Sequence, residues 1–183
     1  MADLATATRK AALTARGGFA EVVLTPAPAA SRLSLRAGAD ALSGLSAALG
    51  VTLPARPKTS ALSGKRHALW LGPDEWLVID ESEGDLMAAA ASSGTLHSAV
   101  DVSHRNVAVT VSGPGAEVAI NSGCPQDLSM PIFPVGACSR TVLGKVEIVL
   151  LRLAEDTFRV ECWRSFSPYV FGMLSEGAAD AGH

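Results

Sequence analysis

The chain has 183 residues, enough for one domain of ordinary size or for two small ones that share a core. Its net charge of −3 at pH 7 and its pI of about 5.8 give no reason to expect nucleic acid or an anionic membrane as a partner. Charged residues make up only 18% and the mean hydropathy is +0.27, which indicates surface hidden from water. A buried subunit interface explains this balance, and so does an Ala-rich helical surface.

The cysteines argue against two kinds of metal site. Cys124, Cys138 and Cys162 are widely spaced and form no CxxC pair, so the sequence predicts neither zinc nor an iron–sulfur cluster. An odd number of cysteines without a secretory signal is typical of reduced thiols in a cytoplasm, the location that we expect. No stretch reaches the ~18 consecutive apolar residues that predict a membrane-spanning helix.

Residues 1–30 are predicted to form a flexible N-terminal arm. The start is rich in Ala and Thr and carries basic residues, but Asp3 and the lack of an amphipathic repeat argue against a transit peptide. The stretch TPAPAA at 25–30 then breaks any regular element, because proline suits neither a central strand nor a helix interior.

Residues 31–98 are predicted to form a first βαββα module. Its first helix has Leu42, Leu45 and Leu49 on one face and ends at Gly50. Its hairpin joins two apolar runs, each with a tryptophan, through a Gly-Pro-Asp-Glu turn. The expected elements are a strand at 32–36, a helix at 39–50, an exposed loop at 54–64, the hairpin at 67–80 and a helix at 83–91.

Residues 99–176 are predicted to form a second module, and residues 177–183 a disordered tail. Gly113-Pro114-Gly115 opens a helix, where proline fits the first helical position because its missing N–H would be unpaired there. The expected elements are strands at 99–103 and 107–111, a helix at 116–121, an irregular loop at 124–136, strands at 139–143, 146–153 and 158–162, and a helix at 165–174.

The order of these elements is β-α-β-β-α-β followed by β-α-β-β-β-α. It predicts an α+β fold with two ferredoxin-like α/β sandwich modules, whose antiparallel sheets carry helices on one face. Because no long linker separates the modules, we expect them to pack closely against each other.

Asp101, Ser103 and His104 are the residue types of a hydrolase triad at an unsuitable spacing. On a strand, Asp101 and Ser103 share a face while His104 points the other way, whereas a triad needs the histidine between the other two. We therefore expect Asp101 and Ser103 to hydrogen-bond local backbone groups instead.

Gly113-Pro114-Gly115 also resembles part of a phosphate-binding loop. The GxGxxG pattern is incomplete because position 118 is Val118, and no GxxxxGK[ST] motif occurs. A helix N-terminus attracts anions, but a tight strand-to-helix turn is the simpler interpretation. The histidines have no ligand-like spacing and no base lies near Cys124, so we expect no catalytic, cofactor-binding or metal-binding residue.

Aromatic side chains and one loop indicate a contact surface. Tyr169 and Phe171 lie off the inward stripe of the last helix, and exposed aromatic residues often anchor interfaces. The apolar loop at 130–134, which contains Phe133, is typical of a contact surface rather than a free coil. We therefore predict interface roles for Phe133, Tyr169 and Phe171, with core packing as the alternative.

Two segments carry a resemblance to a known family. One is LWLGPDEWLVI at 69–79, and the other is 100–128 continued through FPVGACSRTVLGKVEIVLLRLAEDTFRVECWRSF. Over roughly residues 30–176 the chain resembles the gamma subunit of heterotetrameric sarcosine oxidase. The pattern D-x-S…V-x-G-P-x-A…D-L within the second segment is shared more broadly with the aminomethyltransferase of glycine cleavage, so the resemblance implies the fold of its folate-binding domain.

The aminomethyltransferases carry an Asp-Asp pair shortly before an Arg-Leu at a strand end, and the first Asp is catalytic. Counting back from Arg152-Leu153 places Val146 at the catalytic position and Glu147 at the second. A valine can act neither as an acid nor as a base, and it cannot stabilise a cationic iminium. The resemblance therefore implies a chain with no catalytic residues of its own.

The resemblance further implies a subunit that supports assembly of a flavin-containing complex. Such a complex demethylates sarcosine oxidatively to glycine, hydrogen peroxide and formaldehyde, or methylenetetrahydrofolate when folate is present. It implies FAD, FMN, NAD, tetrahydrofolate and zinc in partner subunits and no cofactor in this chain. The implied partners are the alpha, beta and delta subunits, chiefly alpha, and the chain alone could self-associate.

Two other hypotheses fit the same residues. The chain could be a folate-binding or aminomethyltransferase-like enzyme in its own right, since it shares the broader pattern. It could also be a self-associating scaffold unrelated to the oxidase. Tetrahydrofolate binding by the isolated chain would favour the first, and a stable homodimer is compatible with the second.

Overall fold

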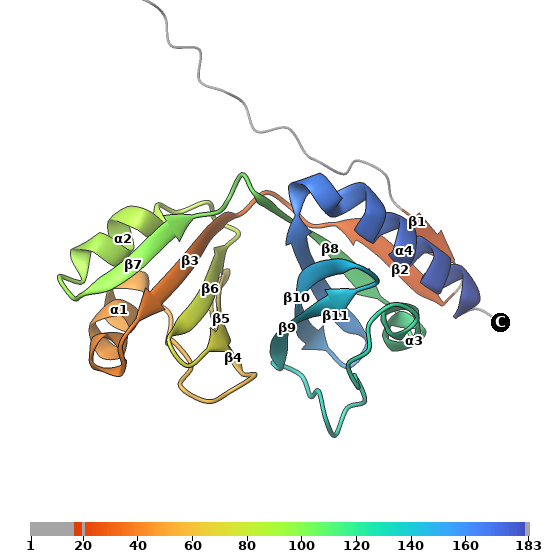
Figure 1. The fold of residues 1–183 in the computed structure, drawn as a ribbon, viewed down its shortest axis with the longest axis horizontal. Coiled ribbons are helices and arrows are strands. Elements are labelled where there is room, and N and C mark those ends of the chain that lie inside the picture. The colour runs from red at the N-terminus through yellow and green to blue at the C-terminus, as the bar shows by residue number, and fades with distance from the viewer. Residues whose placement is uncertain (1–16, 20, 182–183) are drawn as a thin grey trace, which may run out of the picture.

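The computed structural model describes residues 17–19 and 21–181, which form two antiparallel sheets side by side (Figure 1). The six-stranded sheet has the order β1 (Gly17–Phe19), β2 (Val22–Pro26), β8 (Asn106–Ser112), β11 (Thr157–Trp163), β10 (Val146–Ala154), β9 (Cys138–Leu143). The five-stranded sheet has the order β4 (Ser60–Ser63), β5 (Arg66–Gly72), β6 (Glu75–Asp80), β3 (Ser31–Ala37), β7 (His97–Asp101).

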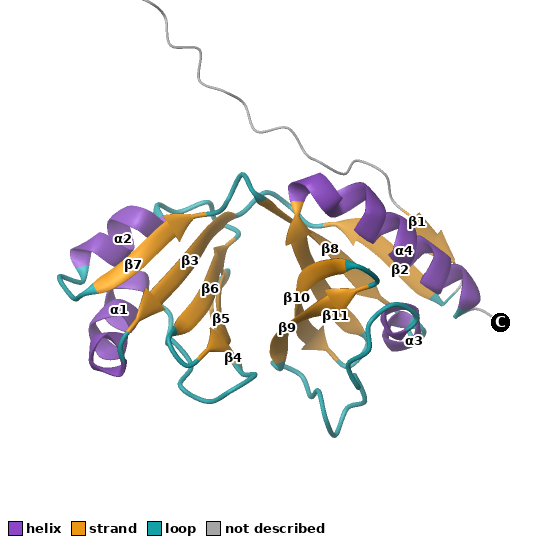
Figure 2. Ribbon diagram, in the orientation of Figure 1, coloured by secondary structure: helices purple, strands orange, loops and turns teal. Residues whose placement is uncertain are grey.

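Helices cover the outer face of each sheet, as Figure 2 shows, and the expected α+β class is confirmed. The five-stranded sheet carries the short 3-10 turn η1 (Ala39–Ala41) with α1 (Leu42–Leu49) and α2 (Leu86–Ser92). The six-stranded sheet carries α3 (Ala116–Asn121), the 3-10 turn η2 (Arg164–Phe166) and α4 (Ser167–Asp180). None of the helices in the described ranges has the length and hydropathy that crossing a membrane requires.

The two modules share a strand order but assemble it from different parts of the chain. In the first module the neighbours run β5-β6-β3-β7, which is the order of a β-α-β-β-α-β unit with β4 added at its edge. In the second they run β10-β11-β8-β2, so the fourth strand precedes the first module in sequence. The chain therefore crosses between the modules twice, at residues 27–30 and 102–105.

Alternation along the strands builds three buried layers. In β3, Leu33 and Leu35 face α1 and α2, while Arg32 faces the other sheet. In β11, Phe158 and Val160 pack in the layer beneath α3 and α4. The layer between the sheets is apolar where Leu69, Leu77, Ile79, Val149 and Leu151 meet. Both faces of each sheet are thus covered.

The expected N-terminal arm at 1–30 is wrong where residues are described. Residues 17–19 and 22–26 are strands, and β2 pairs with β8 in register Leu24↔Val111. Val22 and Leu24 are fully buried, so this segment contributes to the core of the second module. Pro26 ends the strand, where a missing N–H is tolerated. Residues 1–16 lie outside the described residues.

Two other expected boundaries differ from the structure. β7 pairs with β3, so the boundary between 98 and 99 cuts a strand of the first module. The expected disordered tail at 177–183 is wrong through Asp180, where α4 ends. This last part of α4 is ordered because it packs against α3. The two helices lie so close that a Cβ on Gly177 would be 2.3 Å from the carbonyl oxygen of Ala119. Residues 182–183 lie outside the described residues. The expected loop at 54–64 contains the edge strand β4.

Candidate interaction surface

Val146, which the motif count places at the catalytic position of the aminomethyltransferases, is part of the core here. Val146 begins β10 and is buried in the layer beneath α3 and α4. Glu147 points to the opposite face, as expected for the next residue of a strand, and its Oε1 lies 3.8 Å from Nε of Arg140. A buried valine supplies no charge or proton to any reaction.

Asp101, Ser103 and His104 form a structural turn between β7 and β8. Ser103 Oγ accepts a hydrogen bond from the backbone N–H of Arg32 at 2.8 Å, and the N–H of Ser103 donates to Asp101 Oδ1 at 2.8 Å. His104 is exposed at the turn. The expectation that Asp101 and Ser103 bond backbone groups is confirmed, and these bonds hold the second crossover against β3.

The turn before α3 fastens β2 to the second module. The N–H of Gly115 donates to the carbonyl oxygen of Glu21 at 3.1 Å, and the N–H of Gly113 donates to that of Asp156 at 3.0 Å. Gly113 has φ of 113°, and a Cβ there would lie 2.4 Å from the Glu21 oxygen. The interpretation as a tight turn is confirmed, because protein carbonyls take these two N–H groups of the turn.

The cysteines are buried, free thiols. Burial raises the pKa of Cys138 and of Cys162 to about 12, which keeps both protonated at neutral pH. The Sγ of Cys138 lies 3.2 Å from the carbonyl oxygen of Thr59. Within residues 17–19 and 21–181, no group of three or more His, Cys, Asp or Glu is placed to hold a metal ion.

A buried ionic network joins the two modules. Glu161 of β11 accepts from Nε of Arg32 at 2.7 Å and from Nε of Arg159 at 2.8 Å, and Nη1 of Arg159 lies 2.5 Å from Glu81 Oε1. Burial alone would raise the pKa of Glu161, but Arg159 and Arg32 hold it below its usual range. Burial and the charge of Arg159 lower the pKa of His67 nearby. The network fixes β3 against β11.

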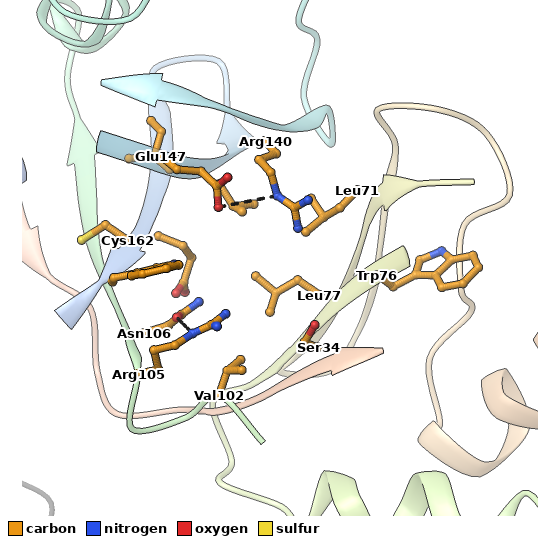
Figure 3. A pocket seen from close by; sticks show the side chains of 14 residues that line it. Ser34, Leu71, Trp76, Leu77, Val102, Arg105, Asn106, Arg140, Glu147 and Cys162 are labelled. Atoms are coloured by element: carbon orange, nitrogen blue, oxygen red, sulfur yellow. Dashed lines mark hydrogen bonds and ion pairs between the residues drawn. The ribbon is translucent and has the colours of Figure 1, made fainter. Parts of the chain in front are cut away.

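A small cavity lies beside this network, between the sheets (Figure 3). Leu77, Arg105 and Arg140 line it from both modules, while the Trp76 ring points away into the first module. Its volume of about 40 Å³ is little more than the roughly 30 Å³ that one water molecule occupies in the liquid. Sites for organic ligands usually measure about 300–1,000 Å³, so this cavity is too small for a folate.

The structure separates the three predicted interface residues. Phe133 is only 1% exposed, because the loop folds back and places its ring in the core beneath α3 and α4. The predicted contact role of the Phe133 side chain is therefore wrong. Phe171 is half-buried against the same core. Tyr169 is exposed and lies over the turn at Gly144.

Sequence reasoning named Tyr169 but missed the other exposed side chains Arg105, Trp163 and Phe166; we call these four residues the aromatic surface. Trp163 and Phe166 are 43% and 44% exposed with ring centroids 6.1 Å apart, and Cζ of Arg105 lies 5.1 Å from the Trp163 ring. The alternation of β11 holds the signal: with residues 158, 160 and 162 inward, Trp163 had to face away from the helix-covered core. Trp, Tyr and Arg are the residues that most often dominate binding at interfaces.

Comparisons with known proteins give independent evidence on the family of this chain. A family model described as sarcosine oxidase, gamma subunit family, matches residues 36–180. The gamma subunit of sarcosine oxidase from Arthrobacter sp is 34% identical over 145 residues, which are 76% of this chain and 71% of that protein.

Solved structures extend the comparison to the fold. The structure of heterotetrameric sarcosine oxidase from Corynebacterium sp. U-96 in complex with pyrrole 2-carboxylate contains a chain that matches with a TM-score of 0.84 and 26% identity, over 91% of this chain and 89% of that one. Glycine cleavage system aminomethyltransferase T from Bartonella henselae matches with a TM-score of 0.63 and 11% identity, over 85% of this chain and 45% of that one, and shares the fold. The resemblance inferred from the sequence is confirmed: the chain belongs to the sarcosine oxidase gamma subunit family.

Proposed function

We propose that this chain is a non-catalytic gamma subunit in a heterotetrameric sarcosine oxidase, where it supports assembly. The family match over residues 36–180 carries the proposal. Val146, buried at the position of the aminomethyltransferase carboxylate, supports a structural role because it leaves no group for proton or iminium chemistry. On this proposal, the chain has the fold of the aminomethyltransferases without their catalytic chemistry.

The complex would oxidise sarcosine to glycine with release of hydrogen peroxide and of formaldehyde or methylenetetrahydrofolate. FAD, FMN, NAD, tetrahydrofolate and zinc would belong to the alpha, beta and delta subunits, in a cytoplasmic enzyme. This chain would pack chiefly against alpha, with Tyr169 and the rest of the aromatic surface in the contact. The exposure of Trp163 and Phe166 in a chain of low charge supports that placement. An isolated chain would self-associate through the same uncovered surface.

Co-expression with the three other subunits tests the proposal. We expect one stoichiometric complex that carries flavin absorbance and turns over sarcosine, and a marked loss of assembled complex when this chain is omitted. A complex that assembles and turns over normally without the chain would refute the role. Micromolar binding of tetrahydrofolate to the isolated chain, measured by calorimetry, would favour the folate-binding alternative instead.

A further inference from the structure

A second surface feature lies where loops of the two modules meet. It is an open groove of about 710 Å³ between residues 52–61 of the first module and residues 132–137 of the second. In Figure 1 these segments run at the bottom of the molecule, below β4 and β9. We call this surface between residues 52–61 and 132–137 the inter-module groove.

Backbone hydrogen bonds between the modules hold the walls of the groove together. The N–H of Cys138 donates to the carbonyl oxygen of Lys58 at 3.0 Å. Ser60 donates to the carbonyl oxygen of Gly136 through its N–H at 2.9 Å and through its Oγ at 2.7 Å. Thr59 and Ala137 form an antiparallel bridge between these bonds. The walls are therefore positioned before anything binds.

Each wall is also anchored to its own module. Nε1 of the buried Trp76 donates to the carbonyl oxygen of Pro54 at 2.8 Å, which fixes the first wall. Nη1 of the buried Arg152 donates to the carbonyl oxygens of Leu128 and Phe133, at 2.6 and 2.9 Å, which fixes the second. Prolines in both walls restrict the backbone further. A preformed surface binds with a smaller entropy loss than a mobile loop.

Lys58 has a strained backbone in the first wall. Its φ is 58°, in the left-handed region that a lysine seldom adopts. The bond from Cys138 to its carbonyl oxygen holds it there. Strain of this kind persists where the surrounding structure fixes it and is common at binding sites.

The groove combines apolar side chains with positive charge. Ile132 and Val135 are 61% and 50% exposed, which leaves two large aliphatic groups in water. Arg56 and Lys58 are exposed beside them, and the residues that line the groove include no Asp or Glu. A complementary occupant therefore carries apolar side chains to cover Ile132 and Val135, and carboxylates to pair with the two cations.

We propose that the inter-module groove docks a segment of another subunit of the oxidase that combines aliphatic or aromatic side chains with Asp or Glu. This inference rests on the proposed function and gives it a second contact, distinct from the aromatic surface. A two-fold contact with another copy of this chain, centred on the groove, is disfavoured. It would bring Arg56 and Lys58 against the same residues of the second copy.

Matched variants in the co-expressed four-subunit complex test the groove. Val135→Asp and Lys58→Glu change an apolar and a charged residue of the groove, and Val118→Asp on α3 and Lys65→Glu at the β4–β5 turn make the same changes at other exposed positions. We expect each groove variant to weaken association with the other subunits at least about tenfold, and each control less than about twofold. Thermal unfolding of each variant checks that it is folded. If Lys58→Glu is unfolded, the association measured for Val135→Asp alone tests the groove.

Salt dependence gives an independent readout. Association of the wild-type chain should weaken as ionic strength rises, and Lys58→Glu should lose most of that dependence. Groove variants that join the complex like wild type would overturn the groove assignment while leaving the proposed function intact. Failure of the wild-type chain to join would refute the proposed function itself. Groove variants that abolish only self-association of the isolated chain would identify a second copy as the occupant and overturn the inference.

Discussion

The buried layer between the two sheets differs from the two layers beneath the helices. The helix-covered layers are aliphatic and aromatic, with the buried charges Asp80 and Arg152 near strand ends. The central layer places Arg159 and Glu161 in the middle of β11, where Glu161 accepts hydrogen bonds from Arg159 and from Arg32 of the other module. Apolar packing tolerates small shifts of one surface over another, whereas a bidentate ion pair has few geometries. We infer that the charges set how the modules are aligned and the apolar layers supply most of the burial.

The largest effect should come from removing the central carboxylate. Glu161→Gln leaves Arg32 and Arg159 buried without their shared anion, so we expect the free energy of unfolding to fall by about 3–5 kcal/mol. Ile148→Val, in the helix-covered layer of the same module, should cost about 1 kcal/mol. Urea denaturation measures both. Equal losses would mean that charge and apolar contacts contribute alike in the two layers.

A triple replacement tests whether the buried charges serve alignment of the modules rather than stability. Arg32→Met, Glu161→Leu and Arg159→Met together remove the three most deeply buried charges of the network and retain apolar volume, while the partly exposed Glu81 remains. Because buried ion pairs pay a large desolvation penalty, we expect this variant to regain most of the stability that Glu161→Gln loses. If the charges set the alignment, amide exchange between β3 and β11 should nevertheless be faster than in wild type.

Arg152 is a buried charge at the edge of a helix-covered layer. Arg152→Met removes the donor that the carbonyl oxygens of Leu128 and Phe133 share, and leaves them in a buried site. We expect a loss of about 3–4 kcal/mol in the free energy of unfolding, with faster amide exchange confined to the loop before β9. Uniformly faster exchange throughout the second module would show that Arg152 supports the whole layer instead.

A smaller effect is expected where β2 joins the second module. Gly113→Ala introduces a Cβ at φ of 113°, within 2.4 Å of the Glu21 oxygen, and should cost about 2–3 kcal/mol. Gly94→Ala has a positive φ of 65° but open space around it, and should cost about 1 kcal/mol. Chemical denaturation compares the two. Similar values would assign the cost to backbone conformation alone.

The smallest effect concerns pH and His67, which faces the central layer. Its pKa is lowered in the folded chain, so between the unfolded value of about 6.5 and the lower folded value the unfolded chain binds more protons. This contribution to stability is present above about pH 6.5 and is lost as the pH falls toward the folded pKa. Urea midpoints of wild type should fall over this window more steeply than those of His67→Gln. An unchanged slope would assign the titration to another group.

Local patterns predicted much of each module. The leucine stripe of α1, the tryptophan hairpin and the Gly113 turn depend on neighbours in sequence, and all three were found where expected. β2 was missed because its partner β8 lies about 80 residues further on, and prolines obscure its alternation. Phe133 was placed on the surface because nothing nearby in sequence shows that Arg152 folds its loop inward.

The buried charges also could not be predicted from local sequence. Arg159 and Glu161 alternate with apolar residues on β11, a pattern that normally indicates a solvated face. They are buried only because the first module covers that face, and the sequence of β11 carries no record of it.

The position of β2 has a consequence for the order in which the protein is synthesised. β2 leaves the ribosome before any strand of the first module, yet β8, its partner, begins at residue 106. At about 5–20 residues per second, β2 waits roughly 4–16 s for its partner β8. All strands of the first module are complete by Asp101, so that module can form first. Until β8 arrives, Val22 and Leu24 lack the core that buries them in the folded chain, and apolar segments of this kind are prone to aggregation.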